Sequence, residues 1–252
     1  MEMEYITSRQ NPLMVQTVKL LTSRKHRRAQ GMFAGEGTKL LEEAVRWIPQ
    51  QLHTVILREG TVCPPLPQHV RQVTVPHRLM DQISSMETSE GAVFLATLPS
   101  EPMGAVVPGT LVLDGIQDPG NVGTILRTAD ALDVPVLLTQ GCADPYNPKT
   151  VRATMGAVFR TPPGNISRED LVEQCKAHEI PLMATALSSG AEDIRQAKVK
   201  EAAVVIGSEG QGVSSMLLAA ASNRLVIPMH PRCESLNAAV AAAIVLWQMT
   251  EL

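Results

Sequence analysis

The sequence is poor in aromatic residues, because Phe, Trp and Tyr together make up 3% of its 252 residues. Aliphatic side chains must therefore fill its cores, and a surface of several rings for stacking nucleobases is not expected. Long hydrophobic runs are also missing. The most apolar segment, AAVAAAIVLWQM at residues 238–249, is short for a bilayer and rich in alanine, so we interpret it as a buried helix. The first residues lack a basic stretch followed by an apolar run, so we expect no signal peptide and no membrane association.

Cysteine is scarce and scattered. The four cysteines form no C-x-x-C pair and have no histidine at ligand spacing; they are Cys63, Cys142, Cys175 and Cys233. This spacing argues against a zinc site and against a framework of disulfides. We therefore expect no metal, and a cytoplasmic location agrees with the free thiols.

The net charge of −3 conceals a basic N-terminal segment. Residues 1–28 contain two acids, and their basic residues are Arg9, Lys19, Arg24, Lys25, Arg27 and Arg28. Such an arm could bind a polyanion, or it could be the solvated face of a helix, and composition alone favours neither.

Turn-forming residues divide the chain. In residues 1–98, strand-like and helical segments alternate, which indicates a small α/β domain. A single helix is expected over residues 11–29, starting at Asn11-Pro12. The stretch that follows, LPSEPMGAVVPG, is rich in proline and glycine, and we interpret residues 99–109 as a linker.

Residues 110–252 alternate strands with helices again, and here the strands are almost continuously apolar. Such strands are typical of a parallel sheet covered by helices on both faces. We therefore predict a doubly wound α/β domain whose ligand binds at the carboxyl ends of the strands.

Three segments of this domain carry candidate functional residues. In the first, LVLDGIQDPGNVGTILRTADAL, Asn121 stands where a helix N-cap is expected, and Arg127 projects away from the apolar face. In the second, AAVVIGSEGQGVSSML, Gly207 predicts a close approach of backbone, and Glu209 lies at the tip of a strand. The glycine order there differs from the dinucleotide-binding pattern, which disfavours a nicotinamide dehydrogenase. In the third, residues 224–249, Ser235 and Asn237 lie at the start of the last helix. Taken singly, each polar residue could be a cap or a surface side chain.

In order along the chain, these segments resemble the motifs of a known family. The patterns D-P-G-N-V-G-x-x-x-R-T-A, I-G-S-E-G-Q-G-V and I-P-M-x-x-x-x-E-S-L-N-x-x-V-A-A-A-I are similar to the three motifs of the SpoU (TrmH) family of SPOUT methyltransferases. Between the first two, Lys149, Arg152, Thr154, Gly156-Ala157 and Phe159 also match. The N-terminal part resembles that family's substrate-binding domain of ribosomal-protein L30e type, with fewer matches at Ser8, Asn11-Pro12, Arg27, Phe33, Glu36-Gly37 and Glu43-Ala44.

The resemblance implies an S-adenosylmethionine-dependent RNA 2′-O-ribose methyltransferase that acts as a homodimer and has a C-terminal trefoil knot. The implied cofactor-binding residues are Gly207, Ile227, Met229, Ser235, Leu236 and Asn237. The implied catalytic residues are Asn121, Arg127, Glu209, Ser235 and Asn237. Arginine is a poor base because its pKa lies far above neutral pH in proteins. We therefore expect Arg127 to stabilise the developing alkoxide while an RNA phosphate or water takes the proton.

The substrate expected from this resemblance is ribosomal RNA, since family members that act on transfer RNA more often carry short basic extensions. We expect RNA contacts from Arg9, Arg24, Lys25, Arg27, Arg28, Lys149 and Arg152. Transfer RNA, or a non-catalytic RNA-binding or assembly role, is the alternative. The sequence departs from the family pattern at Pro231, where glycine is usual, at Thr154, where serine is frequent, and at Ala238-Ala239. These departures affect loop geometry and leave the implied catalytic residues unchanged.

Overall fold

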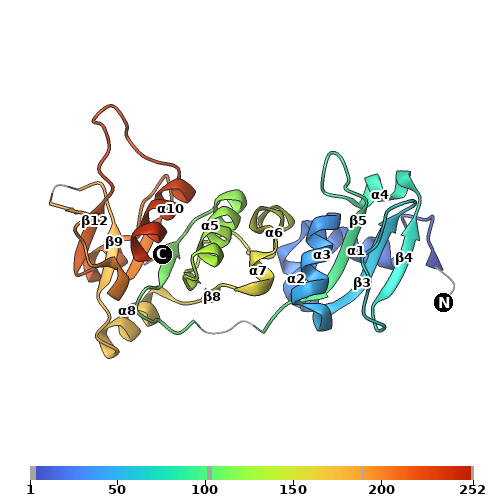
Figure 1. The fold of residues 1–252 in the computed structure, drawn as a ribbon, viewed down its shortest axis with the longest axis horizontal. Helices are drawn as coiled ribbons and strands as arrows, with labels where there is room; N and C mark the ends of the chain where they lie inside the picture. Colours follow the sequence, from blue (N-terminus) through green and yellow to red (C-terminus); the bar gives the residue numbers. More distant parts are fainter. Residues whose placement is uncertain (1–3, 101–103, 189, 251–252) are drawn as a thin grey trace. The chain divides into compact units, whose positions relative to one another are not determined.

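A computed structural model describes residues 4–100, 104–188 and 190–250, and these residues form two compact units (Figure 1). The N-terminal unit contains the described residues up to Ser100 together with Asp144–Arg160. The C-terminal unit contains the remaining described residues. Residues 101–103 of the expected linker lie outside the described part of the chain.

The N-terminal unit is built on a mixed sheet with strand order β1-β4-β3-β5-β2. The strands are β1 (Glu4–Tyr5), β2 (Met32–Glu36), β3 (Leu52–Arg58), β4 (Arg71–Val75) and β5 (Ala92–Thr97). β1, β4 and β3 run parallel, whereas β5 is antiparallel to both of its neighbours. One apolar cluster includes residues of α1 (Pro12–Thr22) and α4 (His77–Ile83), and a second includes residues of α3 (Thr38–Trp47). The small α/β domain expected from the sequence is therefore present, with β1 as an additional strand.

The expected single helix over residues 11–29 is two helices, α1 and α2 (Arg24–Gln30). Ser23 separates them because its backbone is extended, with φ −124° and ψ 111°. The backbone N–H of Ser23 donates to the carbonyl of Lys19, and its hydroxyl accepts from the N–H of His26 at 3.2 Å. Ser23 thus ends one helix and caps the next.

The segment Asp144–Arg160 packs with the N-terminal unit, although the sequence assigned it to the second domain. It contains α6 (Pro148–Thr154) and α7 (Ala157–Arg160), whose Val151, Val158 and Phe159 join the second cluster. All three phenylalanines of the protein meet there. The ring centroid of Phe33 lies 6.3 Å from that of Phe94 and 6.0 Å from that of Phe159. The three phenylalanine rings thus pack together where this segment joins the unit.

The C-terminal unit contains a seven-stranded sheet in which every pair is parallel, with strand order β10-β12-β9-β11-β6-β7-β8. The strands are β6 (Leu111–Asp114), β7 (Val136–Leu138), β8 (Gly164–Asn165), β9 (Leu182–Thr185), β10 (Glu192–Asp193), β11 (Ala203–Gly207) and β12 (Asn223–Val226). The parallel sheet predicted from the apolar strands is confirmed. The short edge strands β8 and β10 were not predicted, because two residues give no pattern.

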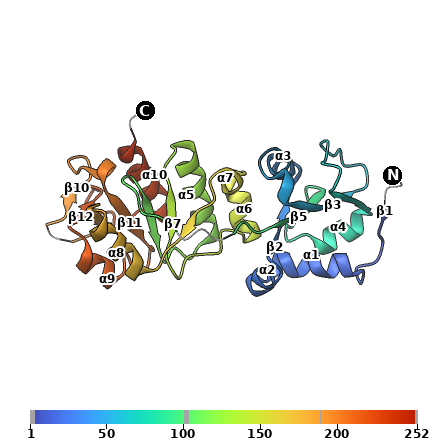
Figure 2. The same ribbon diagram turned by 90° about the horizontal axis from the view of Figure 1, so that it is seen from below.

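Helices cover both faces of this sheet (Figure 2). Leu111 and Leu113 of β6 point to one face, where they meet α5 (Pro119–Ala131) and α10 (Ala238–Met249). Val112 points to the other face, toward the cluster that includes residues of α8 (Arg168–Ala177) and α9 (Ser215–Ala220). Successive residues of a strand point to opposite faces, so strands covered on both sides must be apolar at every position.

The last helix, α10, is only half buried. Ala242, Val245 and Leu246 are buried against the sheet, whereas Val240 is 50% exposed and Trp247 is 61% exposed. The expectation of a buried helix therefore holds for one face of α10 only. None of the described helices is long and apolar enough to cross a membrane.

Candidate active site

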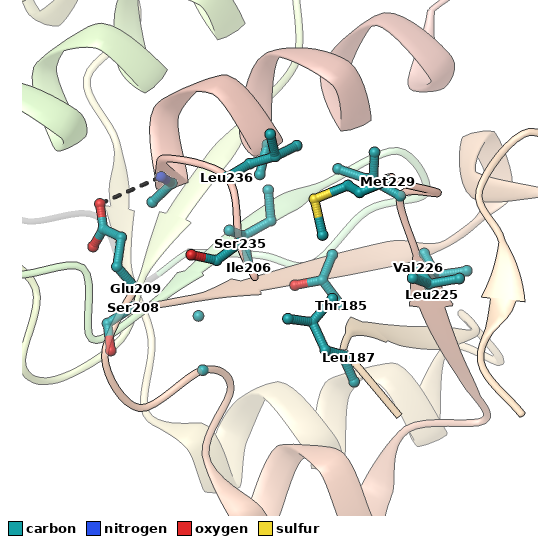
Figure 3. Close-up of a pocket in the computed structure, with 16 residues that line it drawn as sticks. Thr185, Leu187, Ile206, Ser208, Glu209, Leu225, Val226, Met229, Ser235 and Leu236 are labelled. Carbon is teal, nitrogen blue, oxygen red and sulfur yellow. Dashed lines mark hydrogen bonds between the residues drawn. The ribbon is translucent and has the colours of Figure 1, made fainter. Parts of the chain in front are cut away.

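A cavity of about 260 Å³ opens at the carboxyl ends of β9, β11 and β12 (Figure 3). This is the edge of a parallel sheet where ligands are expected. The cavity is lined by the strand ends, the loops that follow them and the start of α10; its residues are Thr185, Ala186, Leu187, Ile206, Gly207, Ser208, Glu209, Gly212, Leu225, Val226, Ile227, Met229, Ser235, Leu236, Ala238 and Ala241.

Most of the lining is apolar, with a few polar groups between. Figure 3 shows the side chains of Leu187, Met229 and Leu236 around one space, with the hydroxyls of Thr185 and Ser235 beside it. Apolar walls with a small number of polar groups are typical of sites for small organic ligands and cofactors. Six residues predicted from the sequence line this cavity: Gly207, Glu209, Ile227, Met229, Ser235 and Leu236.

Next to the cavity, Asn121, Glu209 and Asn237 form a hydrogen-bonded network. The side-chain amide of Asn121 donates to Glu209 Oε1, and the amide of Asn237 donates to Asn121 Oδ1 at 3.1 Å. Glu209 Oε1 also accepts from the backbone N–H of Ala238 at 3.3 Å. The three motifs, distant in sequence, therefore meet at one carboxylate.

Helix capping explains how two of these side chains are positioned. The expectation that Asn121 caps α5 is wrong: the cap is Asp118, whose carboxylate accepts from the N–H of Asn121 at 2.9 Å. The Asn121 side chain is thus free to reach Glu209. Asn237 does cap α10, because its Oδ1 accepts from Ala239 N–H at 3.0 Å and Val240 N–H at 3.3 Å. Ser235 precedes the helix and lies in the loop at the cavity wall.

The close backbone approach predicted at Gly207 is made by the loop that follows this residue in the chain. A Cβ atom on Gly207 would lie 2.0 Å from the carbonyl carbon of Gly212 and 2.1 Å from the nitrogen of Val213. Gly212 has φ +66°, which favours glycine, and its N–H donates to the carbonyl of Ser208 at 2.8 Å. We call residues 208–214, which carry Glu209, the glycine loop.

We predict that Gly207→Ala displaces the glycine loop, because its Cβ would clash with backbone rather than with a flexible side chain. Calorimetry should show binding of S-adenosylhomocysteine weakened by about 5- to 150-fold, which corresponds to a cost of about 1–3 kcal/mol for overpacking. Gly210→Ala is the matched control, since nothing lies within 4 Å of its Cβ position. Equal binding by both variants would contradict this role of Gly207.

Arg127 is not part of the network. It is exposed on α5 and forms no hydrogen bond or ion pair with any residue that the structure describes. It follows Asn121 by six residues, so it points about 120° away around the helix axis. The structure thus brings Asn121, Glu209 and Asn237 together and leaves the Arg127 guanidinium open to an external group.

Comparison with known proteins matches this arrangement to a family. Residues 108–247, more than half of the chain, match the model of the SpoU rRNA Methylase family. The chain belongs to this family. Residues 6–93 also match the MRM3-like substrate binding domain. The resemblance to the SpoU family and the presence of a substrate-binding domain in the N-terminal part are confirmed.

Relatives of the SpoU chain are similar over nearly their whole length. The 23S rRNA (guanosine(2553)-2′-O)-methyltransferase RlmP of Bacillus subtilis is 32% identical, over 92% of this chain and 93% of its own. A structure of a TrmH-family protein from Porphyromonas gingivalis is 33% identical with a TM-score of 0.82, covering 95% of this chain and 97% of its own. An AdoMet-bound rRNA methyltransferase from Sinorhizobium meliloti is 28% identical with a TM-score of 0.83, covering 98% of this chain and 97% of its own.

Several cavity residues of this SpoU domain were not predicted from the sequence. Thr185, Leu187 and Leu225 line the cavity from β9 and β12 or the residues just after. These strands carry no recognisable motif. The rule that ligands bind at the carboxyl ends of parallel strands could have pointed to Thr185, the last residue of its strand.

The residues expected to contact RNA differ in accessibility. Arg9, Arg24, Lys25, Arg28 and Lys149 are exposed. Arg152 is half-buried, and its guanidinium donates to the buried Glu36 at 2.9 Å.

The expectation that the basic residues of α2 contact RNA is wrong for Arg27. It is 2% exposed, and its guanidinium donates to Asp144 Oδ2 at 2.6 and 3.0 Å and to the carbonyl of Leu20 at 2.7 Å. A buried guanidinium with these partners cannot reach a phosphate, so Arg27 holds the unit together instead.

Proposed function

We propose that this protein transfers a methyl group from S-adenosylmethionine to ribose 2′-hydroxyls of ribosomal RNA. The observation that carries the proposal is the junction of the three motifs at Glu209, beside an apolar cavity, in a chain of the SpoU rRNA Methylase family. The Bacillus subtilis relative, named as a 2′-O-methyltransferase of 23S rRNA, supports the ribose position and the class of RNA.

The cavity residues fit this cofactor. Ile206, Leu225, Ile227 and Leu236 offer apolar walls for an adenine ring, and backbone groups beside Gly207 lie at the rim. Met229 and Ser235 complete the wall, and Asn237 holds the loop before α10 through its capping bonds. When bound, S-adenosylmethionine supplies a methyl group on a positively charged sulfur. The carboxylate of Glu209 gives this wall a negative charge suited to such a cation.

The protein's own residues would align the ribose oxygen and manage its charge. Asn121 and the Ala238 N–H fix the Glu209 carboxylate, so its orientation is set before substrate arrives. The planar guanidinium of Arg127 stabilises the negative charge that develops on the 2′-oxygen. The proton passes to an RNA phosphate or to water. No metal is required for these steps.

We further propose that the protein acts as a homodimer through α10. Val240, Ala243, Ile244 and Trp247 follow the spacing of one helix face, and that face is exposed or half-exposed. An apolar stripe of this kind is typical of a protein–protein contact, and a second copy of the chain offers a matching surface. The trefoil knot and the cytoplasmic location stay predictions that rest on the family and on a ribosomal substrate.

A charge on this stripe tests the dimer. Trp247→Glu is expected to convert the protein from dimer to monomer in size-exclusion chromatography with light scattering, because it places a carboxylate in an apolar contact. The control is Met216→Glu on α9, which is 39% exposed in the same unit and should leave the dimer intact. A wild-type monomer, or a Trp247→Glu dimer, would rule out this interface.

The N-terminal unit supports ribosomal over transfer RNA as substrate. It matches a substrate-binding domain and exposes basic side chains on α1 and α2, which suit a large RNA bound through its phosphates. Methyl transfer from labelled S-adenosylmethionine should therefore favour unmodified ribosomal RNA over transfer RNA. Preference for transfer RNA would overturn the choice of substrate. Calorimetry should detect binding of S-adenosylhomocysteine and none of NADH, and the opposite result would overturn the cofactor.

A further inference from the structure

Asp114 is a buried carboxylate for which neither the motifs nor the chemistry proposed above gives a role. It is the last residue of β6, pairs in the sheet with Gly207, and is 2% exposed. Burying a charge is costly unless the group is well hydrogen-bonded, so its partners show what it stabilises.

The two oxygens of Asp114 bind different parts of the fold. Oδ1 accepts from the hydroxyl of Thr139, just after β7, at 2.8 Å and from the guanidinium of Arg168, at the start of α8, at 2.7 Å. Oδ2 accepts from the backbone N–H of Ser214 at 2.8 Å. Thr139 and Arg168 therefore hold the carboxylate, and the carboxylate in turn holds Ser214.

Ser214 ends the glycine loop and is the N-cap residue of α9. The residues just before it, Gly212 and Val213, are pressed against Gly207, where no Cβ atom fits. The returning end of the loop is thus fixed beside the strand end from which the loop leaves, and Glu209 lies in the loop between Gly207 and Gly212.

The charge state of Asp114 suits this bond. Burial alone would raise the pKa of the carboxyl, but hydrogen bonds from the Ser214 N–H, Thr139 and Arg168 outweigh burial and hold the pKa below its usual value. The group is therefore an anion at neutral pH, and both oxygens can only accept hydrogen bonds.

We propose that Asp114 is a positioning residue for the methyl-transfer site, because its bond to the Ser214 N–H holds the glycine loop, and with it Glu209, against the cavity. This inference rests on the proposed function. It predicts that loss of the Ser214 bond weakens cofactor binding, whereas loss of a bond on the Oδ1 side costs stability only.

Two variants remove the Ser214 bond from opposite ends. Asp114→Asn can turn a donating amide toward Ser214, and Ser214→Pro deletes the N–H at a position whose φ of −56° already suits proline. We expect each to raise the Kd for S-adenosylhomocysteine by about tenfold, the size expected for a lost hydrogen bond to a charged group. The double variant should be no weaker than either single one, since both remove the same bond.

Thr139→Val is the matched control, because it removes one hydrogen bond from Oδ1 and leaves the Ser214 bond in place. It should lower the Tm without changing that Kd. The proposal would be overturned if Asp114→Asn lowered the Tm with an unchanged Kd. It would also be overturned if the effects of Asp114→Asn and Ser214→Pro on the binding free energy were fully additive in the double variant.

Hydrogen exchange distinguishes a failure of the proposed role of Asp114 from a failure of the proposed function. In the protein without ligand, Asp114→Asn should speed amide exchange in residues 208–214, and Thr139→Val should not. Wild-type protein that failed to bind S-adenosylhomocysteine would refute the proposed function alone. Unchanged exchange in Asp114→Asn would refute the role of Asp114, whatever the ligand.

Discussion

Replacing Arg127 by alanine is expected to lower methyl transfer to ribosomal RNA by about 100- to 1,000-fold, the usual effect of removing one group that stabilises a developing oxyanion. The side chain is exposed and unpaired among the described residues, so its loss should leave the fold intact. It does not line the cavity, so binding of S-adenosylhomocysteine should not change. A rate measurement at saturating cofactor, with calorimetry on the same protein, tests both statements.

Two substitutions control this result. Arg127→Lys keeps the charge without the planar fork of donors, so we expect an intermediate rate. Arg195→Ala removes an exposed arginine that is ion-paired to Asp193 elsewhere in the unit, and should have the wild-type rate. An Arg127→Ala protein with full activity would disprove the role given to this residue.

The second large effect is on stability. Arg27→Ala should lower the free energy of unfolding of the N-terminal unit by about 3–5 kcal/mol, because it leaves the largely buried Asp144 carboxylate, whose side chain is 14% exposed, without its partner. The side chains of Arg27 and Asp144 are 3% and 14% exposed, so water cannot replace the lost bonds easily. Urea denaturation followed by circular dichroism would measure the change.

Neighbouring and paired substitutions make this prediction specific. Lys25→Ala, an exposed cation on the same helix, should cost less than about 0.5 kcal/mol. The double variant Arg27→Met with Asp144→Asn should recover part of the loss, since no unpaired charge stays buried. Arg27→Ala with wild-type stability and weakened RNA binding would instead restore the original expectation that Arg27 contacts RNA.

The sheet of the C-terminal unit could be predicted because its physical signal is local. Leu111, Val112 and Leu113 are apolar in succession, and a strand covered on both faces requires this. Much of the cavity was predictable as well, since Gly207, Glu209 and Ser235 lie in motifs whose order along the chain is specific. Residues such as Leu225 carry no such signal and become visible only when the strand ends are brought together.

Partners distant in sequence explain what could not be predicted. Arg27 lies in a run of basic residues that resembles an RNA-binding arm, and Asp144, which neutralises it, comes 117 residues later. The break at Ser23 turns one expected helix into two. Similarly, Asn121 is polar at a helix start, and only the structure shows that Asp118 is the cap, leaving Asn121 for Glu209.

The position of the transferred methyl group tests the central claim most directly. Unmodified ribosomal RNA is incubated with the protein and labelled S-adenosylmethionine, digested to nucleosides and analysed by mass spectrometry, with a parallel alkaline hydrolysis. We predict label on the ribose and an alkali-resistant linkage at the modified nucleotide, because a methylated 2′-oxygen cannot attack the neighbouring phosphate. Label on a base, or no transfer by a protein that binds S-adenosylhomocysteine, would contradict the account.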